Sequence, residues 1–192
     1  EFIRQGWSRK NLLRLIVTSA TYRQQAGPSY RLSAEQIRDS VLSVSGLLHP
    51  KLGGPSVFPP QTKSIGEGIY GGGGWRTSTG PDRYRRSLYT HRKRSMPYAM
   101  HDTFDAPSHE ACVARREVSN TPLQALVLLN DPTYVEAARA LGECIMREGG
   151  NDAEARIRWA FLEALSRPPS DRELKIVADL QVAQLKRYLV DG

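Results

Sequence analysis

The stretch TPLQALVLLNDPTYVEAARAL, residues 121–141, contains two helix starts in succession. Thr121 is a favourable N-cap residue, and Pro122 stands at the first helical position, where its missing N–H costs nothing. Asn130 ends this helix, and the Asp-Pro pair after it repeats the start signal. Apolar residues then recur at helical spacing up to the glycines at 149–150. This stretch therefore predicts two consecutive helices.

Similar signals lie on both sides of this stretch. Ser33 and Gln36 form a capping-box pattern that opens a helix, which we expect to end before Gly53. Other helices are expected at about 9–20, 153–167 and 171–189, with caps at Ser8, at Asn151 or Asp152, and at Ser170. The predicted fold class is mainly α, an irregular domain of about five to six helices with at most a short strand pair.

A long Gly/Pro-rich segment, residues 53–120, separates helical parts at 8–50 and 121–190. It contains four consecutive glycines at 71–74, which cannot support a helix or a packed strand. A short strand is expected at 87–90, and residues 97–120 are expected to be irregular. We interpret residues 1–192 as a single helical domain in which this loop is either functional or mobile.

The net charge of +7 is concentrated in the front of the chain. Residues 1–110 hold sixteen Lys and Arg against eight acids, whereas residues 111–192 hold eleven against twelve. No apolar run reaches the roughly 18 residues that a membrane span needs. Cys112 and Cys144 could form one disulfide, although Cys144 fits a buried free thiol better. The haem attachment motif Cys-x-x-Cys-His does not occur, so no cofactor is expected in this domain.

Acid–base residue types are concentrated in the segment HDTFDAPSHEAC, residues 101–112. If the chain is an enzyme domain, its best catalytic candidates are Arg86, Asp105, His109 and Glu110. The spacing matches no named metal motif, and no metal site is predicted. The alternative is a loop held to the helices by polar contacts. In that case we expect Asp105 to pair with one of four arginines, which are Arg85, Arg86, Arg115 and Arg116.

The segment RYRRSLYTHRKR, residues 83–94, has six Lys and Arg and no acid. Basic and aromatic residues in alternation suit polyanions, of which polysaccharide is favoured over nucleic acid. The alternative is an internal scaffold of arginines paired with acids such as Asp105 and Glu110. We expect a mixture, in which at least one arginine turns inward while Arg92, Lys93 and Arg94 stay in solvent as candidate polyanion-binding residues.

A family resemblance runs along nearly the whole chain. Its motifs are GWSRK (6–10), LIVTSATYR (15–23), RLSAEQIRD (31–39), SGL (45–47), GGPSV (53–57), YRRSLY (84–89), FDAP (104–107), NTPLQAL (120–126), LNDP (129–132) and RPP (167–169). Together they resemble the planctomycete-secreted domain of unknown function, which lies towards the C-terminal end of large proteins with cytochrome c-type domains.

This resemblance implies a secreted or periplasmic location and a multidomain parent that carries haem on its other domains. Those domains would be partners of this one. It assigns no reaction and no catalytic residue. The chain looks like a fragment of the family's domain, and only residues 24–30 separate two motifs that are usually further apart.

Three functional hypotheses follow. The first is a non-catalytic interaction or scaffold module of a secreted, cytochrome-bearing protein involved with extracellular polymers. The second is an enzyme domain, an oxidoreductase or a hydrolase acting on polysaccharide. The third is a polyanion-binding module that uses the 83–94 segment.

Overall fold

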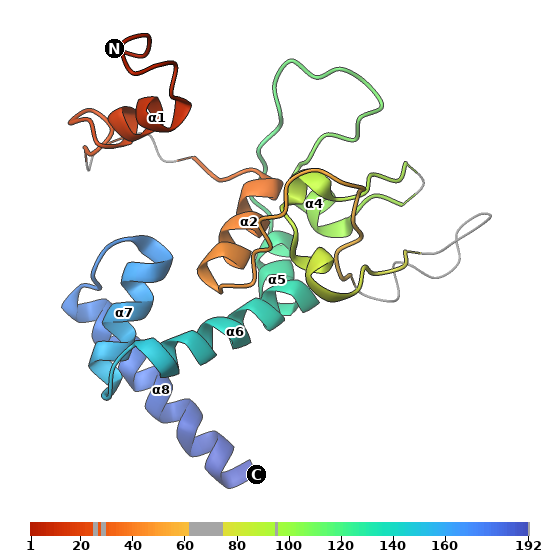
Figure 1. Ribbon diagram of the computed structural model, residues 1–192. Helices are drawn as coiled ribbons and strands as arrows, with labels where there is room; N and C mark the ends of the chain where they lie inside the picture. The colour runs from red at the N-terminus through yellow and green to blue at the C-terminus, as the bar shows by residue number, and fades with distance from the viewer. Residues whose placement is uncertain (25–26, 28–29, 62–74, 95, 192) are drawn as a thin grey trace. The chain divides into compact units, whose positions relative to one another are not determined.

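The computed structural model describes residues 1–24, 27, 30–61, 75–94 and 96–191. The glycine run at 71–74 lies outside the described residues. The chain forms two compact units, residues 1–31 and residues 32–192. Figure 1 shows the helices of both units with their labels.

The first unit contains one helix, α1 (Arg9–Val17). As predicted, Ser8 caps it, and the side chain of Ser8 accepts a hydrogen bond from the backbone N–H of Asn11. The helix ends at Val17, before its expected end at Ala20. Thr18 is the C-cap residue, and its hydroxyl donates to the Arg14 carbonyl at 2.7 Å. No residue of α1 is buried.

The second unit holds the other helices. They are α2 (Ala34–Val44), α4 (Ala99–Thr103), α5 (Pro122–Asn130), α6 (Pro132–Glu148), α7 (Ala153–Leu165) and α8 (Asp171–Asp191), with two short 3₁₀ helices, η1 (Gly80–Tyr84) and η2 (Ser87–Tyr89). The capping boxes at Ser33 and Ser170 and the caps at Thr121, Asp131 and Asp152 form as predicted. The mainly α fold is therefore confirmed, and none of the helices in the described part of the chain is long and apolar enough to span a membrane.

Two details of the prediction are corrected. The described residues form seven α-helices, because α4 lies in the segment that was expected to be irregular. The strand at 87–90 is wrong, since Thr90 N–H bonds back to the Ser87 carbonyl and closes a 3₁₀ turn. Two isolated parallel bridges, which are His49 with Arg85 and Val57 with Thr90, replace it. Helix α2 ends at Val44, before Gly53 as expected, and Gly46 just after it takes a left-handed conformation with φ of 74°.

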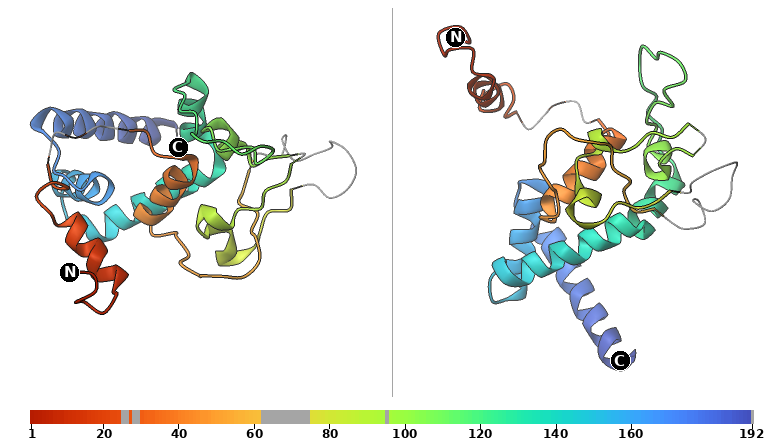
Figure 2. Two further views of the ribbon diagram at one scale, coloured as in Figure 1. Left: turned by 90° about the horizontal axis from the view of Figure 1, so that it is seen from above. Right: turned by 45° about the vertical axis from the view of Figure 1, so that its right-hand side comes forward.

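The core of the second unit lies where α2, α4 and α6 meet. Its buried residues are Ala34, Tyr98, Met100, Phe104 and Tyr134. Helix α4 packs between α2 and α5, and both views in Figure 2 show α5 leading directly into α6. The C-terminal helices then pack in chain order, α6 on α7 and α7 on α8. The short helix α4 thus brings the start of the 101–112 segment, residues 101–103, beside α2.

Candidate functional site

Two charged side chains in the described part of the chain are fully buried, and the first is Arg38 on α2, whose exposed fraction is 0%. Its Nη1 donates to the Arg85 carbonyl at 2.8 Å, and its Nη2 donates to the Arg83 carbonyl at 2.9 Å. Both carbonyls belong to the basic segment, more than forty residues away in sequence. Guanidinium groups suit this use because they present several donors in a fixed fork. Arg38 therefore fixes the path of the basic segment over α2.

Arg85 continues this arrangement from the basic segment itself. It is also fully buried, and its guanidinium donates to the carbonyls of Pro55 at 3.0 Å, Lys51 at 3.2 Å and Gly53. It also stacks over the Tyr89 ring, 3.8 Å from the centroid. We expected an inward arginine to meet an acid, but the bonds to these carbonyls anchor it to the backbone of the 51–55 loop. The carbonyls of an irregular loop have no donors from a helix or a sheet, and the guanidinium of Arg85 supplies donors to them.

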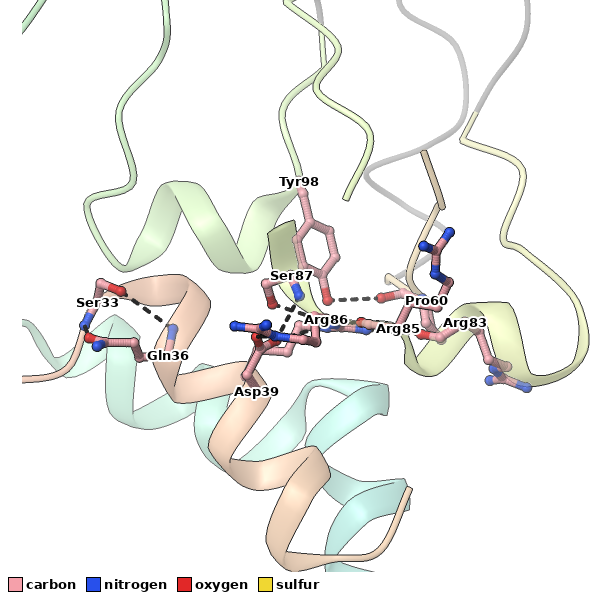
Figure 3. Close-up of polar contacts among 10 residues, drawn as sticks. Ser33, Gln36, Asp39, Pro60, Arg83, Arg85, Arg86, Ser87 and Tyr98 are labelled. Atoms are coloured by element: carbon pink, nitrogen blue, oxygen red, sulfur yellow. Dashed lines mark hydrogen bonds and ion pairs between the residues drawn. The ribbon is translucent and has the colours of Figure 1, made fainter. Parts of the chain in front are cut away.

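The acids pair with the outer arginines of the segment. Asp39 lies 3.5 Å from Nε of Arg86 and accepts the backbone N–H of Ser87 at 2.7 Å (Figure 3). Glu136 lies 3.4 Å from Arg83. Arginines of the basic segment are therefore held by internal contacts, with backbone carbonyls as the main buried partners and Asp39 and Glu136 as the acids.

A pocket of about 430 Å³ lies beside this scaffold. It is lined by residues 91–94, 97–98, 101–102 and 106–110, and we name it the 91–110 pocket. Its lining includes three basic residues at 92–94, three histidines, and the carboxylates of Asp102 and Glu110. It joins the end of the basic segment to the acid–base segment, two stretches that the sequence analysis treated separately.

The four catalytic candidates divide into two pairs. His109 and Glu110 are exposed and line the 91–110 pocket. Arg86 and Asp105 are not among its lining residues. Arg86 pairs with Asp39, and the carboxylate of Asp105 accepts the backbone N–H of Ser119 at 2.8 Å.

Asp105 also accepts the Ser119 hydroxyl, at 2.9 Å to each carboxylate oxygen. Of the four arginines expected near Asp105, Arg85, Arg86 and Arg116 all have other partners. The contacts of Asp105 with Ser119 close the excursion between α4 and α5. They hold the loop through Ser119, and the expected pairing of Asp105 with an arginine stays a prediction.

The three polyanion-binding candidates all line the pocket, but they differ in their partners. Arg92 is exposed, as expected, and it is bonded to Glu35 and to the Pro107 carbonyl, each at 3.3 Å. Lys93 is half-buried, whereas Arg94 is exposed and has no ion-pair partner among the described residues. Burial raises the pKa of Glu35, but hydrogen bonds from Arg116, from the backbone and from Ser33, together with the charge of Arg116, outweigh burial and lower that pKa to about 2.

His101 is the residue that the sequence analysis missed as an individual candidate. It lies on α4 at the pocket, its exposed fraction is 4%, and its Nε2 has no hydrogen-bond partner. Burial lowers its pKa to about 4, against a smaller opposing effect of Glu35, so the ring is neutral at pH 7. The sequence signal for the burial of His101 is its position between Met100 and Phe104, which are both core residues.

Two residues of the 101–112 segment have strained backbones, and of these only His109 lines the 91–110 pocket. Asp105 and His109 have φ of 59° and 64°, a left-handed region that residues other than glycine seldom adopt. Such conformations cost free energy and are concentrated at binding and catalytic sites. The described residues contain no cluster of three or more His, Cys, Asp or Glu with metal-binding geometry. Cys112 and Cys144 are both free thiols, and Cys144 is only half-buried.

A family model matches residues 1–181, and its description is PSD1, protein of unknown function (DUF1553). The chain belongs to this family. The match spans both units and covers the arginine scaffold and the 91–110 pocket. The resemblance to a family of unknown function is thereby confirmed, whereas the expected source and the cytochrome association are not part of the PSD1 description. No curated protein and no solved structure matches the chain.

Proposed function

We propose that this PSD1 chain is a non-catalytic interaction module of a larger exported protein. Neighbouring domains of that protein carry the haem, and the assembly works on extracellular polymers. The module's task is to hold those domains in position.

The observation that supports this proposal is the use of the buried arginines. Arg38 and Arg85 together bind five backbone carbonyls of the 51–55 and 83–85 segments. These bonds give an irregular surface one conformation before any partner arrives, which lowers the entropic cost of binding. Two of the four catalytic candidates, Arg86 and Asp105, take part in the same kind of internal contact.

The test is to mix the purified chain with the separately expressed remainder of its parent protein. Titration calorimetry should show binding between the two, and the chain alone should show no turnover of neutral or sulfated polysaccharides. Glu110→Gln removes an exposed pocket carboxylate, and Glu163→Gln removes an exposed carboxylate on α7 as a matched control. Turnover that Glu110→Gln abolishes and Glu163→Gln preserves would establish the oxidoreductase or hydrolase alternative instead.

A second candidate function is polyanion binding, and the grouping of Arg92, Lys93 and Arg94 around one pocket favours it. Retention on a heparin column should fall steeply with salt, because exposed charges are screened and counterions are released. The informative variant is Lys93→Glu with Arg94→Glu, since changing Arg92 would also break its bond to Glu35. Reversal of Lys186 and Arg187, two exposed residues of α8, is the matched control.

Retention that survives reversal of Lys93 and Arg94 as well as it survives the control would place the binding surface elsewhere. Absence of retention at low salt would exclude polyanion binding, and only the role as an interaction module would remain. Equal retention of nucleic acid and sulfated polysaccharide would show that the surface responds to charge density only.

A further inference from the structure

The 91–110 pocket has the size of a small-molecule site. Its volume of about 430 Å³ falls within the roughly 300–1,000 Å³ of typical ligand pockets. The arginine scaffold does not fill it, and neither Arg86 nor Asp105 lines it. Its wall combines charges of both signs with the prolines Pro97 and Pro107.

The charges of the wall suit a ligand with two kinds of group. Lys93 and Arg94 can bind anionic oxygens through charge-assisted hydrogen bonds, which are stronger than neutral ones. Asp102 and Glu110, when ionised, only accept hydrogen bonds, so they suit ligand hydroxyl groups. An inorganic anion satisfies the first pair and leaves the second without donors.

His101 also lines the pocket, and it has a buried polar atom without a partner. Its Nε2 has no hydrogen-bond partner although the residue is 96% buried, as its exposed fraction of 4% shows. A buried polar atom without a partner costs about 1–3 kcal/mol, which a bound ligand would recover. The ring is neutral at pH 7, so it offers one N–H donor and one acceptor rather than a charge.

We propose that the 91–110 pocket binds a small hydroxylated anion. The anionic oxygens lie at Lys93 and Arg94, and the hydroxyls bond to Asp102, Glu110 and Nε2 of His101. Acidic sugars, sulfated sugars and sugar phosphates share this chemistry. The inference rests on the polyanion-binding candidate above. It specifies that the ligand is a single sugar-sized anion bound in a pocket, rather than a polymer bound along a charged surface.

Three probes separate the parts of the proposal by calorimetry on the whole chain. Glucose 6-sulfate carries both an anion and hydroxyls, inorganic sulfate carries only the anion, and glucose carries only the hydroxyls. Glucose 6-sulfate should bind at least tenfold more tightly than sulfate, and glucose should give no measurable heat. Glucuronic acid and glucose 6-phosphate then show which anionic group is preferred.

Variants and one spectroscopic signal locate the site. Arg94→Glu should weaken binding of glucose 6-sulfate at least tenfold, while Arg187→Glu, on α8, should leave it unchanged. Both positions are exposed, so both variants should fold. The ring signals of His101 in NMR spectra should move when glucose 6-sulfate is added to the unmodified chain and stay in place in Arg94→Glu.

Equal affinity for sulfate and glucose 6-sulfate would overturn the proposal, as would equal effects of Arg94→Glu and Arg187→Glu. Failure of all the monosaccharides to bind would also overturn it. If heparin is retained but no monosaccharide binds, the pocket proposal is refuted and the polyanion-binding function still stands. If neither heparin nor a monosaccharide binds, both of these hypotheses are refuted, and the proposed role as an interaction module remains.

Discussion

Replacing Arg38 by Met should destabilise the second unit strongly. Methionine fills a similar volume but leaves the carbonyls of Arg83 and Arg85 without their donor. Each buried acceptor without a partner costs about 1–3 kcal/mol, which puts the expected loss at about 3 kcal/mol or more. That is a large part of the roughly 5–15 kcal/mol that stabilises a typical domain. The melting temperature should fall by about 6–12 °C, given about 2–4 °C per kcal/mol at this size.

Urea titration followed by circular dichroism measures this loss as a change in midpoint at constant slope. The matched control is Arg86→Met, which removes a half-exposed ion pair with Asp39 at 3.5 Å. Exposed pairs contribute about 1 kcal/mol or less, so this variant should stay close to the unmodified chain. Equal stability of Arg38→Met and Arg86→Met would show that the buried carbonyl contacts do not hold the basic segment in place.

Three further predictions concern single residues. Asp105→Ala should cost about 1–3 kcal/mol in chemical denaturation, because it removes the acceptor of two donors, the backbone N–H and the hydroxyl of Ser119; an unchanged midpoint would contradict the role of Asp105 in holding the loop. Since burial lowers the pKa of His101 from 6.5 to about 4, the unfolded chain binds a proton between these pH values that the folded chain does not. The free energy of unfolding should therefore fall by on the order of 3 kcal/mol as pH drops from about 6.5 to about 4, and this part of the pH dependence should vanish in His101→Gln. Gly149→Ala, at the C-cap of α6, should destabilise by about 1–3 kcal/mol, because the new Cβ would lie 2.6 Å from the Ile145 carbonyl oxygen. Gly142→Ala, inside α6, meets nothing within 4 Å and should stabilise by about 0.5–1 kcal/mol. Thermal melts of the two variants that shift in the same direction would refute this contrast.

The sequence by itself determined the helices and their starts. Each cap joins a side chain to a backbone N–H two or three residues away, as Thr121 does with Gln124 and Asp131 does with Thr133. Such contacts depend only on local residue order, so they can be recognised in the sequence. The same logic failed for α4, whose N-cap residue Tyr98 makes no side-chain capping bond.

Only the tertiary structure decided what the arginines and histidines do. The bonds of Arg38 to the carbonyls of Arg83 and Arg85 span more than forty residues, and backbone carbonyls leave no trace in a sequence. An arginine that binds carbonyls in the core is therefore indistinguishable, in one sequence, from Arg94 in solvent. The pocket also depends on tertiary packing. The contact of α4 with α2 buries His101, and the pocket then has both His101 and the end of the basic segment in its lining.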